Sequence, residues 1–174
     1  MSAYLGYQGP FFEDLEQGQT IFHRRGRTVT FQDNLLISHM LLNASPLHFD
    51  REYMEFTEFK RPLLVTTLIL GITFGIASED FKNVAREVEI TDLRMLAPVF
   101  DGDTLHVVTE VMEKFEEPER RDVGLVVVRH KTYKDNYSTL VMRVDRRLLL
   151  YKRGHNPRRR LGHQGDRLEN REDP

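Results

Sequence analysis

The chain has 174 residues, which is enough for one domain with a substantial hydrophobic core. Apolar residues make up 40% of it and charged residues 30%, and the net charge of −2 gives no indication of a nucleic-acid or anionic-membrane partner. The lack of cysteine excludes disulfide bonds, thiolate metal ligands and a cysteine nucleophile. The first residues do not follow the charged-then-apolar order of a signal peptide, so we expect a cytoplasmic protein.

The N-terminal part of the chain predicts an arm, a strand and a helix. Residues 1–17 are rich in glycine, proline and aromatic side chains, and we interpret them as an irregular arm. Residues 18–30 predict a first strand or strand pair. A helix is then expected from Thr30, whose hydroxyl can form a capping box with Asp33, to about Leu42.

The segment from Pro62 to Ser78, PLLVTTLILGITFGIAS, carries no charged residue. It is shorter than the ~20 mostly apolar residues that a membrane-spanning helix needs. A helix that is apolar on all sides in a soluble protein is a buried one, so we predict a long central helix from about Arg61 to Glu79, with Pro62 in its first turn. The stretch DREYMEFTEF just before it predicts a short helix capped by Asp50.

From about Val84 onward the apolar residues recur at every second position, which predicts β-strands. Four long strands are expected, in residues 86–99, 103–117, 122–135 and 138–153. In the second of them one face should hold Leu105, Val107, Thr109 and Val111. A hairpin turn at Asp135-Asn136 should join the last two strands. Helices early in the chain and antiparallel strands late indicate an α+β fold, in which the sheet wraps around the central helix.

The end of the chain, residues 153–174, is polar and mixed in charge, a composition that favours disorder. Its run of three arginines, Arg158 to Arg160, can contact the phosphate of a nucleotide-bearing cofactor or form a solvated basic patch. We therefore divide the chain into an N-terminal arm (1–17), one domain (18–152) and a flexible tail (153–174).

The stretch NASPLHFD, residues 43–50, contains the histidine of greatest interest. Pro46 fixes the backbone two residues before His48, and Asn43 lies five residues before the histidine. Such a corner is either a plain connection between helices or a device that holds His48 toward a pocket, where it transfers protons.

The other six histidines have simpler interpretations. Two lie in the tail, namely His155 and His163. Three fall among alternating strand residues and are expected to be half-exposed, namely His23, His106 and His130. His39 precedes Asn43 by one helical turn, so the two share a face if the helix continues.

Three motifs in the same order resemble the MaoC-like dehydratases, a family with the hotdog fold that includes the (R)-specific enoyl-CoA hydratases. NASPLHFD resembles the signature D-x-N-P-[LI]-H-x-D, EFKRPLL resembles F-x-R-P-[IL]-x-x-G, and APVFDGDTL resembles the turn P-V-x-x-G-D-x-[LV]. The resemblance covers roughly Gly18 to Tyr151. It implies a hotdog fold, in which an antiparallel sheet wraps around a long central helix, and an acyl-CoA thioester substrate.

The chain departs from the family pattern at three places. The position of the catalytic aspartate is occupied by Asn43, the asparagine before the proline is replaced by Ser45, and the His-Gly pair at the start of the central helix is Val65-Thr66. With Asn43 at the position of the aspartate, the chain resembles a branch of single-domain MaoC-like proteins that read N-x-x-P-L-H-x-D. This branch includes the itaconyl-CoA and mesaconyl-CoA hydratases. The resemblance therefore implies a short branched dicarboxylyl-CoA as substrate.

The chemistry of hydration is compatible with these residues. His48 can take a proton from water and return it to the α-carbon, and the Asn43 amide can orient the water. The backbone N–H of Thr66, at the N-terminus of the central helix, can hold the thioester oxygen. Coenzyme A is part of the substrate, so no separate cofactor and no metal are expected. Arg61 and Arg94 are candidates for binding a substrate carboxylate.

Alternative functions stay open at this point. The protein can be an (R)-specific hydratase of simple 2-enoyl-CoA thioesters, a thioesterase, or a catalytically silent acyl-CoA-binding subunit in which Asn43 marks a lost carboxylate. In each case a hotdog leaves one sheet edge exposed, which predicts a homodimer or a higher assembly. No nucleic-acid or membrane partner is expected.

Overall fold

The computed structural model describes residues 9–157. Within this range the elements are η1 Phe12–Asp14, β1 Thr20–Thr28, α1 Phe31–Met40, η2 Pro46–His48, α2 Arg51–Met54, α3 Thr66–Ala77, β2 Val84–Met95, β3 Thr104–Glu116, β4 Val123–Lys134 and β5 Thr139–Tyr151. The arginine run at 158–160, most of the expected tail and residues 1–8 of the arm lie outside the described residues. The predicted domain boundaries stay a prediction.

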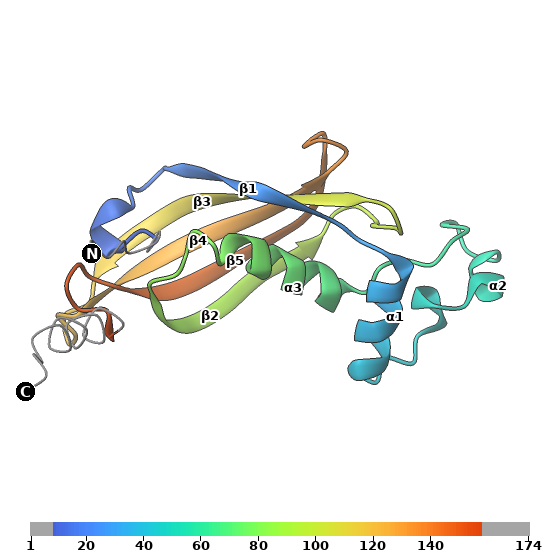
Figure 1. Cartoon of the computed structure of the whole chain (residues 1–174), viewed down its shortest axis with the longest axis horizontal. Coiled ribbons are helices and arrows are strands. Elements are labelled where there is room, and N and C mark those ends of the chain that lie inside the picture. Colours follow the sequence, from blue (N-terminus) through green and yellow to red (C-terminus); the bar gives the residue numbers. More distant parts are fainter. Residues whose placement is uncertain (1–8, 158–174) are drawn as a thin grey trace, which may run out of the picture.

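One five-stranded sheet in the order β1-β3-β4-β5-β2 forms the body of the molecule, and every neighbouring pair is antiparallel. The sheet curves around α3, which lies across its inner face (Figure 1). The predicted α+β hotdog fold is therefore confirmed. The hairpin turn between β4 and β5 is also found, with positive φ angles at Asp135, Asn136 and Tyr137.

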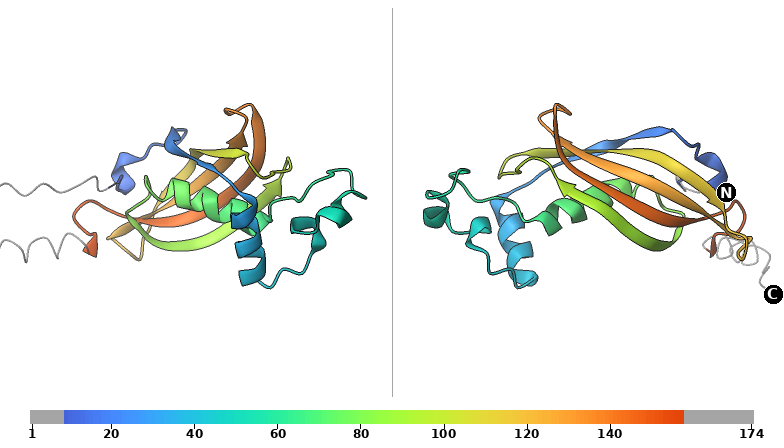
Figure 2. Two further views of the ribbon diagram at one scale, coloured as in Figure 1. Left: turned by 45° about the vertical axis from the view of Figure 1, so that its right-hand side comes forward. Right: turned by 180° about the vertical axis from the view of Figure 1, so that it is seen from behind.

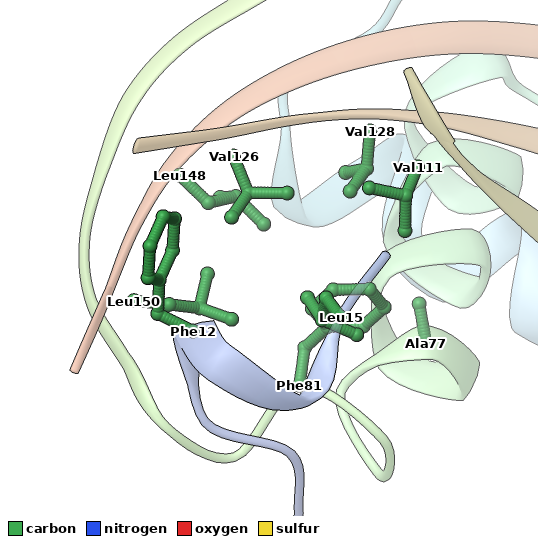
Figure 3. Close-up of a cluster of buried hydrophobic side chains, with 9 residues drawn as sticks. All are labelled: Phe12, Leu15, Ala77, Phe81, Val111, Val126, Val128, Leu148 and Leu150. Atoms are coloured by element: carbon green, nitrogen blue, oxygen red, sulfur yellow. The ribbon is translucent and has the colours of Figure 1, made fainter. Parts of the chain in front are cut away.

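The inner face of the sheet carries two hydrophobic clusters. The first is drawn in Figure 3 and consists of Phe12, Leu15, Ala77, Phe81, Val111, Val126, Val128, Leu148 and Leu150. It lies under the C-terminal end of α3 and is closed by η1, whose Phe12 ring packs over Gly124 so tightly that a Cβ at that glycine would clash. The second consists of Val29, Leu64, Ile69, Val99, Leu105, Val141, Met142 and Val144. It supports the N-terminal end of α3.

A row of polar side chains separates the two clusters and crosses all five strands; we call it the polar row. Its members are Asp80, His23, Thr109, His130, Arg146 and Glu87. Neighbouring members are joined by contacts of 2.6, 2.7, 2.7, 3.4 and 2.8 Å in that order. His23 and His130 are almost fully buried, so the prediction that they are half-exposed is wrong. Their polar atoms can be buried because partners on neighbouring strands bond them.

The central helix differs from its prediction at the N-terminal end. It begins at Thr66, not near Arg61, and the proline at 62 precedes it in an extended segment. The segment is held extended by backbone bonds, from Leu63 N–H to the Leu47 carbonyl and from Leu64 N–H to the Val99 carbonyl, both 2.9 Å. These bonds to distant residues replace the first helical turn.

The opposite side of α3 is open in the single chain. Gly71 and Gly75 are exposed there, whereas Ile69, Thr73 and Ile76 are buried against the sheet. The prediction of a helix buried on all sides is thus wrong for one chain, because the sheet covers only one side. Among residues 9–157 no helix is long and apolar enough to cross a membrane.

Two further helices project from the molecule at the N-terminal end of α3, opposite to η1 (Figures 1 and 2). The capping box of α1 forms as predicted, with Thr30 and Asp33 bonding each other's backbone N–H. Asp50 caps the short α2 as predicted, since its side chain accepts from Tyr53 N–H at 2.8 Å. The connection between these two helices contains His48, and it faces the start of α3.

Candidate active site

The corner that holds His48 is fixed by local bonds. α1 ends at Met40, and Leu42 turns the chain with a φ of 54°. Asn43 N–H then donates to the Ser38 carbonyl at 2.8 Å. The Asn43 side chain accepts from Ser45 N–H at 2.9 Å, a bond typical of an Asx turn. The helix ends before Asn43, so His39 and Asn43 do not share a helical face.

The imidazole of His48 is half-buried, and its hydrogen bond determines where its proton lies. Nδ1 is 2.9 Å from the backbone carbonyl oxygen of Leu63. A carbonyl oxygen can only accept, so Nδ1 must donate and the neutral ring carries its hydrogen there. Nε2 is then left with a free lone pair, which is the state that a general base requires.

A cavity of about 320 Å³ brings His48 to the start of α3. It is lined by His48, Phe59, Leu63, Leu64, Thr66, Ile69, Met95, Leu96, Ala97, Pro98 and Val99. Thr66 is the first residue of α3, where backbone N–H groups have no acceptor within the helix. The cavity therefore combines an imidazole, the positive end of a helix dipole and otherwise apolar walls.

The structure brings together two of the three predicted site residues. His48 and Thr66 line the same cavity, but Asn43 is not among the described residues that line it. The side-chain oxygen of Asn43 already accepts from Ser45 N–H, whereas its NH₂ has no hydrogen bond among the described residues and can donate to a water molecule. The water-orienting role of Asn43 stays a prediction.

Asn34 is a residue of this site that the sequence reasoning missed. It is fully buried and bonds the backbone on both sides of the cavity, at His48 and at the segment before α3. A signal for it exists in the sequence, because Asn34 and Ser38 lie one turn apart and are the buried residues of α1. Polar residues on the buried face of a helix indicate a specific partner.

A second cavity, of about 330 Å³, is lined by several cationic side chains. It is lined by Phe31, Arg51, Glu55, Lys60, Arg61, Pro62 and Asp101. The Arg61 guanidinium lies over the ring of Phe100, 3.8 Å from its centroid. Residues 61–62 line this cavity and residues 63–64 line the first, so one segment contributes to both cavities.

The two predicted carboxylate-binding arginines differ in position. Arg61 lines the second cavity, whereas Arg94 lines neither of these two cavities. The Arg94 side chain is bonded to Asp92 at 2.7 Å on the edge strand β2. That hydrogen bond raises the pKa of Arg94 and lowers the pKa of Asp92.

The described part of the chain contains no group of three or more histidine, aspartate or glutamate side chains that could hold a metal ion. The polar row, which contains two histidines and three charged residues, is instead joined internally by hydrogen bonds. The candidate site is therefore the cavity of His48 and Thr66.

Comparison with known proteins gives one family and several relatives. Residues 14–134 match the family described as MaoC like domain. A beta-methylmalyl-CoA dehydratase of Chloroflexus aurantiacus is 25% identical over 124 residues, which are 71% of this chain and 35% of that protein. The chain thus spans about a third of the length of the curated relative that it matches.

Solved structures agree with the observed topology. A monoamine oxidase regulatory protein of Archaeoglobus fulgidus is 28% identical, with a TM-score of 0.75 over 86% of this chain and 99% of that one. A conserved hypothetical protein of Mycobacterium tuberculosis with a double hotdog fold is 22% identical, with a TM-score of 0.73 over 86% of this chain and 47% of that one. The second likeness concerns the fold alone.

Proposed function

Because this chain belongs to the family of MaoC-like domains, we propose that it is a hydro-lyase that adds water to the double bond of an enoyl-CoA thioester. The observation that carries the proposal is the shared cavity of His48 and Thr66. An imidazole with a free lone pair lies on one wall, and a helix N-terminus lies on another. Hydration of a conjugated thioester needs a proton carrier and a site for negative charge, and these two groups supply them.

The steps follow from these two groups. The thioester oxygen binds the N–H of Thr66, and a water molecule lies between His48 and the β-carbon. His48 Nε2 takes a proton from the water as its oxygen bonds to the β-carbon. The negative charge that develops on the thioester oxygen is stabilised by the first turn of α3. The imidazolium then gives its proton to the α-carbon, so that one water has been added in total.

The Leu63 carbonyl has a part in both states of the imidazole. In the neutral ring it holds the Nδ1 hydrogen in place, and in the imidazolium it still accepts the same hydrogen bond. His48 thus keeps its orientation while Nε2 gains and loses a proton. Asn43 cannot take a proton, so in this proposal His48 performs both transfers and the Asn43 NH₂ only orients the water.

We further propose a short branched dicarboxylyl-CoA, such as itaconyl-CoA or mesaconyl-CoA, as substrate. The resemblance of the corner to that branch of the family supports this choice, and so does the second cavity. Arg51, Lys60 and Arg61 outnumber the carboxylates of Glu55 and Asp101 there, and the segment that carries Arg61 continues into the lining of the first cavity. A guanidinium that stacks on a ring leaves its N–H edge free to bind a carboxylate. A simple 2-enoyl-CoA is the alternative, and its acyl group carries no carboxylate for these cations to bind.

A homodimer belongs to the same proposal. The edge strand β2 exposes large apolar side chains at Val88, Ile90, Leu93 and Met95. A second copy that covers this strand would remove both the exposed edge and the apolar surface. Met95 and Leu96 also line the first cavity, so the second copy would close it. Light scattering should give a dimer or a multiple of it; a fully active monomer of about 20 kDa would contradict this.

The proposed reaction is tested by incubating the protein with itaconyl-CoA, mesaconyl-CoA and crotonyl-CoA and analysing the products by mass spectrometry. We expect a thioester product that has gained one water, with the dicarboxylyl substrates preferred. Release of free coenzyme A without hydration would indicate a thioesterase. Binding of all three thioesters without turnover would indicate a silent acyl-CoA-binding subunit.

A further inference from the structure

Asn34 occupies the fourth position of α1 and has no exposed surface. Its side chain makes three hydrogen bonds, and none of the partners belongs to its own helix. The NH₂ group donates to the His48 carbonyl at 2.6 Å and to the Leu63 carbonyl at 3.0 Å. The side-chain oxygen accepts from the Val65 N–H at 2.8 Å. Both donor hydrogens of the amide are thus used, and so is its oxygen.

The three partners are the backbone groups that place the two functional walls of the first cavity. The His48 carbonyl belongs to the residue that carries the imidazole. The Leu63 carbonyl also accepts the Nδ1 hydrogen of that imidazole, at 2.9 Å. Val65 is the N-cap of α3 and directly precedes Thr66, and its own side chain makes no capping bond. One planar amide therefore joins the proton carrier to the start of the helix.

We infer that Asn34 is a positioning residue, which sets the separation of His48 from the Thr66 N–H and keeps the Nδ1 hydrogen of His48 in place. The inference rests on the proposed function. The site requires two donors and one acceptor at the end of a short side chain, and asparagine is the residue that supplies them there. An ionised aspartate has no donor, leucine has neither donors nor acceptor, and glutamine is longer by one carbon.

A matched control exists one turn further along the same buried face. Ser38 is fully buried as well, and its hydroxyl has no hydrogen-bond partner within the described range 9–157. S38A therefore removes a buried polar group from α1 without touching the backbone groups that place His48 and Thr66. N34L removes the three bonds and keeps the branching of the side chain at Cγ, in a somewhat larger volume. N34D keeps the acceptor for Val65 N–H, and only its protonated form has a donor, a single O–H that can restore one of the two donated bonds.

The kinetic test compares N34L, N34D and S38A with the wild type on the enoyl-CoA that the wild type hydrates best. A displacement of about 1 Å in a reacting group can lower a rate by about a hundredfold, so we expect kcat of N34L to fall by roughly ten- to a hundredfold. KM should change little, because the cavity lining is unchanged, and S38A should keep wild-type kcat. Folding of each variant is verified by circular dichroism and by urea unfolding.

N34D adds a readout that a merely structural asparagine would not give. Burial raises the pKa of an aspartic acid, and only its protonated form can donate to a backbone carbonyl. The ratio of kcat for N34D to kcat for the wild type should therefore rise as the pH is lowered from 8 to 6. An ionised carboxylate at this position favours the imidazolium of His48 and would lower the ratio as the pH falls, so a rise of the ratio reports the donor that protonation restores. If N34L does not fold, the pH dependence of this ratio still tests whether Asn34 is a positioning residue.

A readout without substrate separates this inference from the proposed function. The ring nitrogens of His48 are followed by ¹⁵N NMR and assigned by the signals that H48Q loses. We expect the Nδ1–H form in the wild type and in S38A, and a mixture of both neutral forms in N34L. Wild-type kcat in folded N34L, or a pH-independent ratio for N34D, would overturn the inference. A wild type that hydrates no enoyl-CoA refutes the proposed function, and the NMR spectra of N34L then decide the inference.

Discussion

The histidines of the polar row and the histidine of the corner, His48, differ in how many of their ring nitrogens are bonded. In the polar row, His23 is bonded through Nδ1 to Asp80 and through Nε2 to Thr109. His130 is bonded through Nδ1 to Thr109 and faces Arg146 with Nε2. His48 is instead bonded through Nδ1 alone within the described part of the chain.

The direction of the hydrogen bonds in the polar row follows from one residue. Arg146 can only donate, so Nε2 of His130 accepts and Nδ1 of His130 carries the hydrogen. The Thr109 hydroxyl accepts that hydrogen and donates its own to Nε2 of His23. His23 then donates through Nδ1 to the Asp80 carboxylate. Each member of the row therefore has partners that satisfy its polar atoms, and the imidazole of His130 is neutral.

A histidine is available for proton transfer when one of its ring nitrogens has no hydrogen-bond partner in the protein. Burial holds the pKa of His130 well below its ordinary value, with Arg146 and His23 adding to the effect, so this imidazole resists protonation. Its nitrogens are also occupied, so it has no lone pair for a water molecule. His48 lies in a corner that bonds only one side of its ring, which leaves the other side for a substrate.

The largest effect is expected from removing the available histidine. H48A lacks the group that carries the proton, and general acid–base catalysis typically contributes 10²–10⁴-fold, so kcat should fall by about that factor. The urea midpoint should change little, because His48 is only half-buried. Steady-state kinetics with the hydrated enoyl-CoA measures the loss. Full activity in folded H48A would mean that the corner is structural.

Removing a histidine of the polar row should lower the stability of the protein and leave kcat almost unchanged. H130L leaves Thr109 without its donor and Arg146 without one acceptor, and a buried polar group without its partner costs about 1–3 kcal/mol of stability. Urea unfolding should show a loss of this size, while kcat of the folded protein stays close to that of the wild type. A large loss of kcat without loss of stability would place His130 in catalysis.

The pH dependence of stability should sharpen the contrast. The pKa of His130 is lower in the folded protein than in the unfolded chain, where it is about 6.5. The unfolded chain therefore binds the additional proton first as the pH falls below about 6.5. Stability should then decrease by up to about 1.4 kcal/mol per pH unit until the lower folded pKa is reached. Urea unfolding between pH 7 and 5 should show a steeper decrease for the wild type than for H130L.

The smallest effect is expected at Asn43. N43A removes the acceptor of the Ser45 N–H and one ordinary hydrogen bond to the water. The bond to the water is worth about 0.5–1.5 kcal/mol, so kcat should fall roughly three- to tenfold where circular dichroism shows that the protein is folded. N43D keeps the acceptor for the Ser45 N–H, so the corner should fold, and we expect an active enzyme. Steady-state kinetics compares the two variants. Inactive but folded N43D would indicate that the site requires a neutral group beside a substrate carboxylate.

Local features of the sequence were sufficient for most of the fold. The strands follow from alternation, the start of α1 from the pairing of Thr30 with Asp33, and the start of α2 from Asp50. Each of these signals depends on residues that are neighbours in the chain. The corner of His48 was predicted for the same reason, since Pro46 and the Asx turn of Asn43 lie within a few residues of it.

Features that depend on distant residues were not predictable in the same way. The start of α3 is set by bonds from Leu47, Val99 and Asn34 to the segment before it. The burial of His23 depends on Thr109, which is 86 residues away in the sequence. A single sequence contains no signal that pairs such residues, and strand alternation alone does not tell which polar side chain finds a partner on the inner face.

The most direct measurement is the pH dependence of kcat/KM for the wild type, H48A and H130L on the same enoyl-CoA. If His48 is the base, kcat/KM of the wild type falls as the pH is lowered, because protonation removes the lone pair of Nε2. The same decrease should appear in H130L and should be missing from the residual activity of H48A. A decrease that persists in H48A and disappears in H130L would contradict the assignment and would place the proton transfer in the polar row.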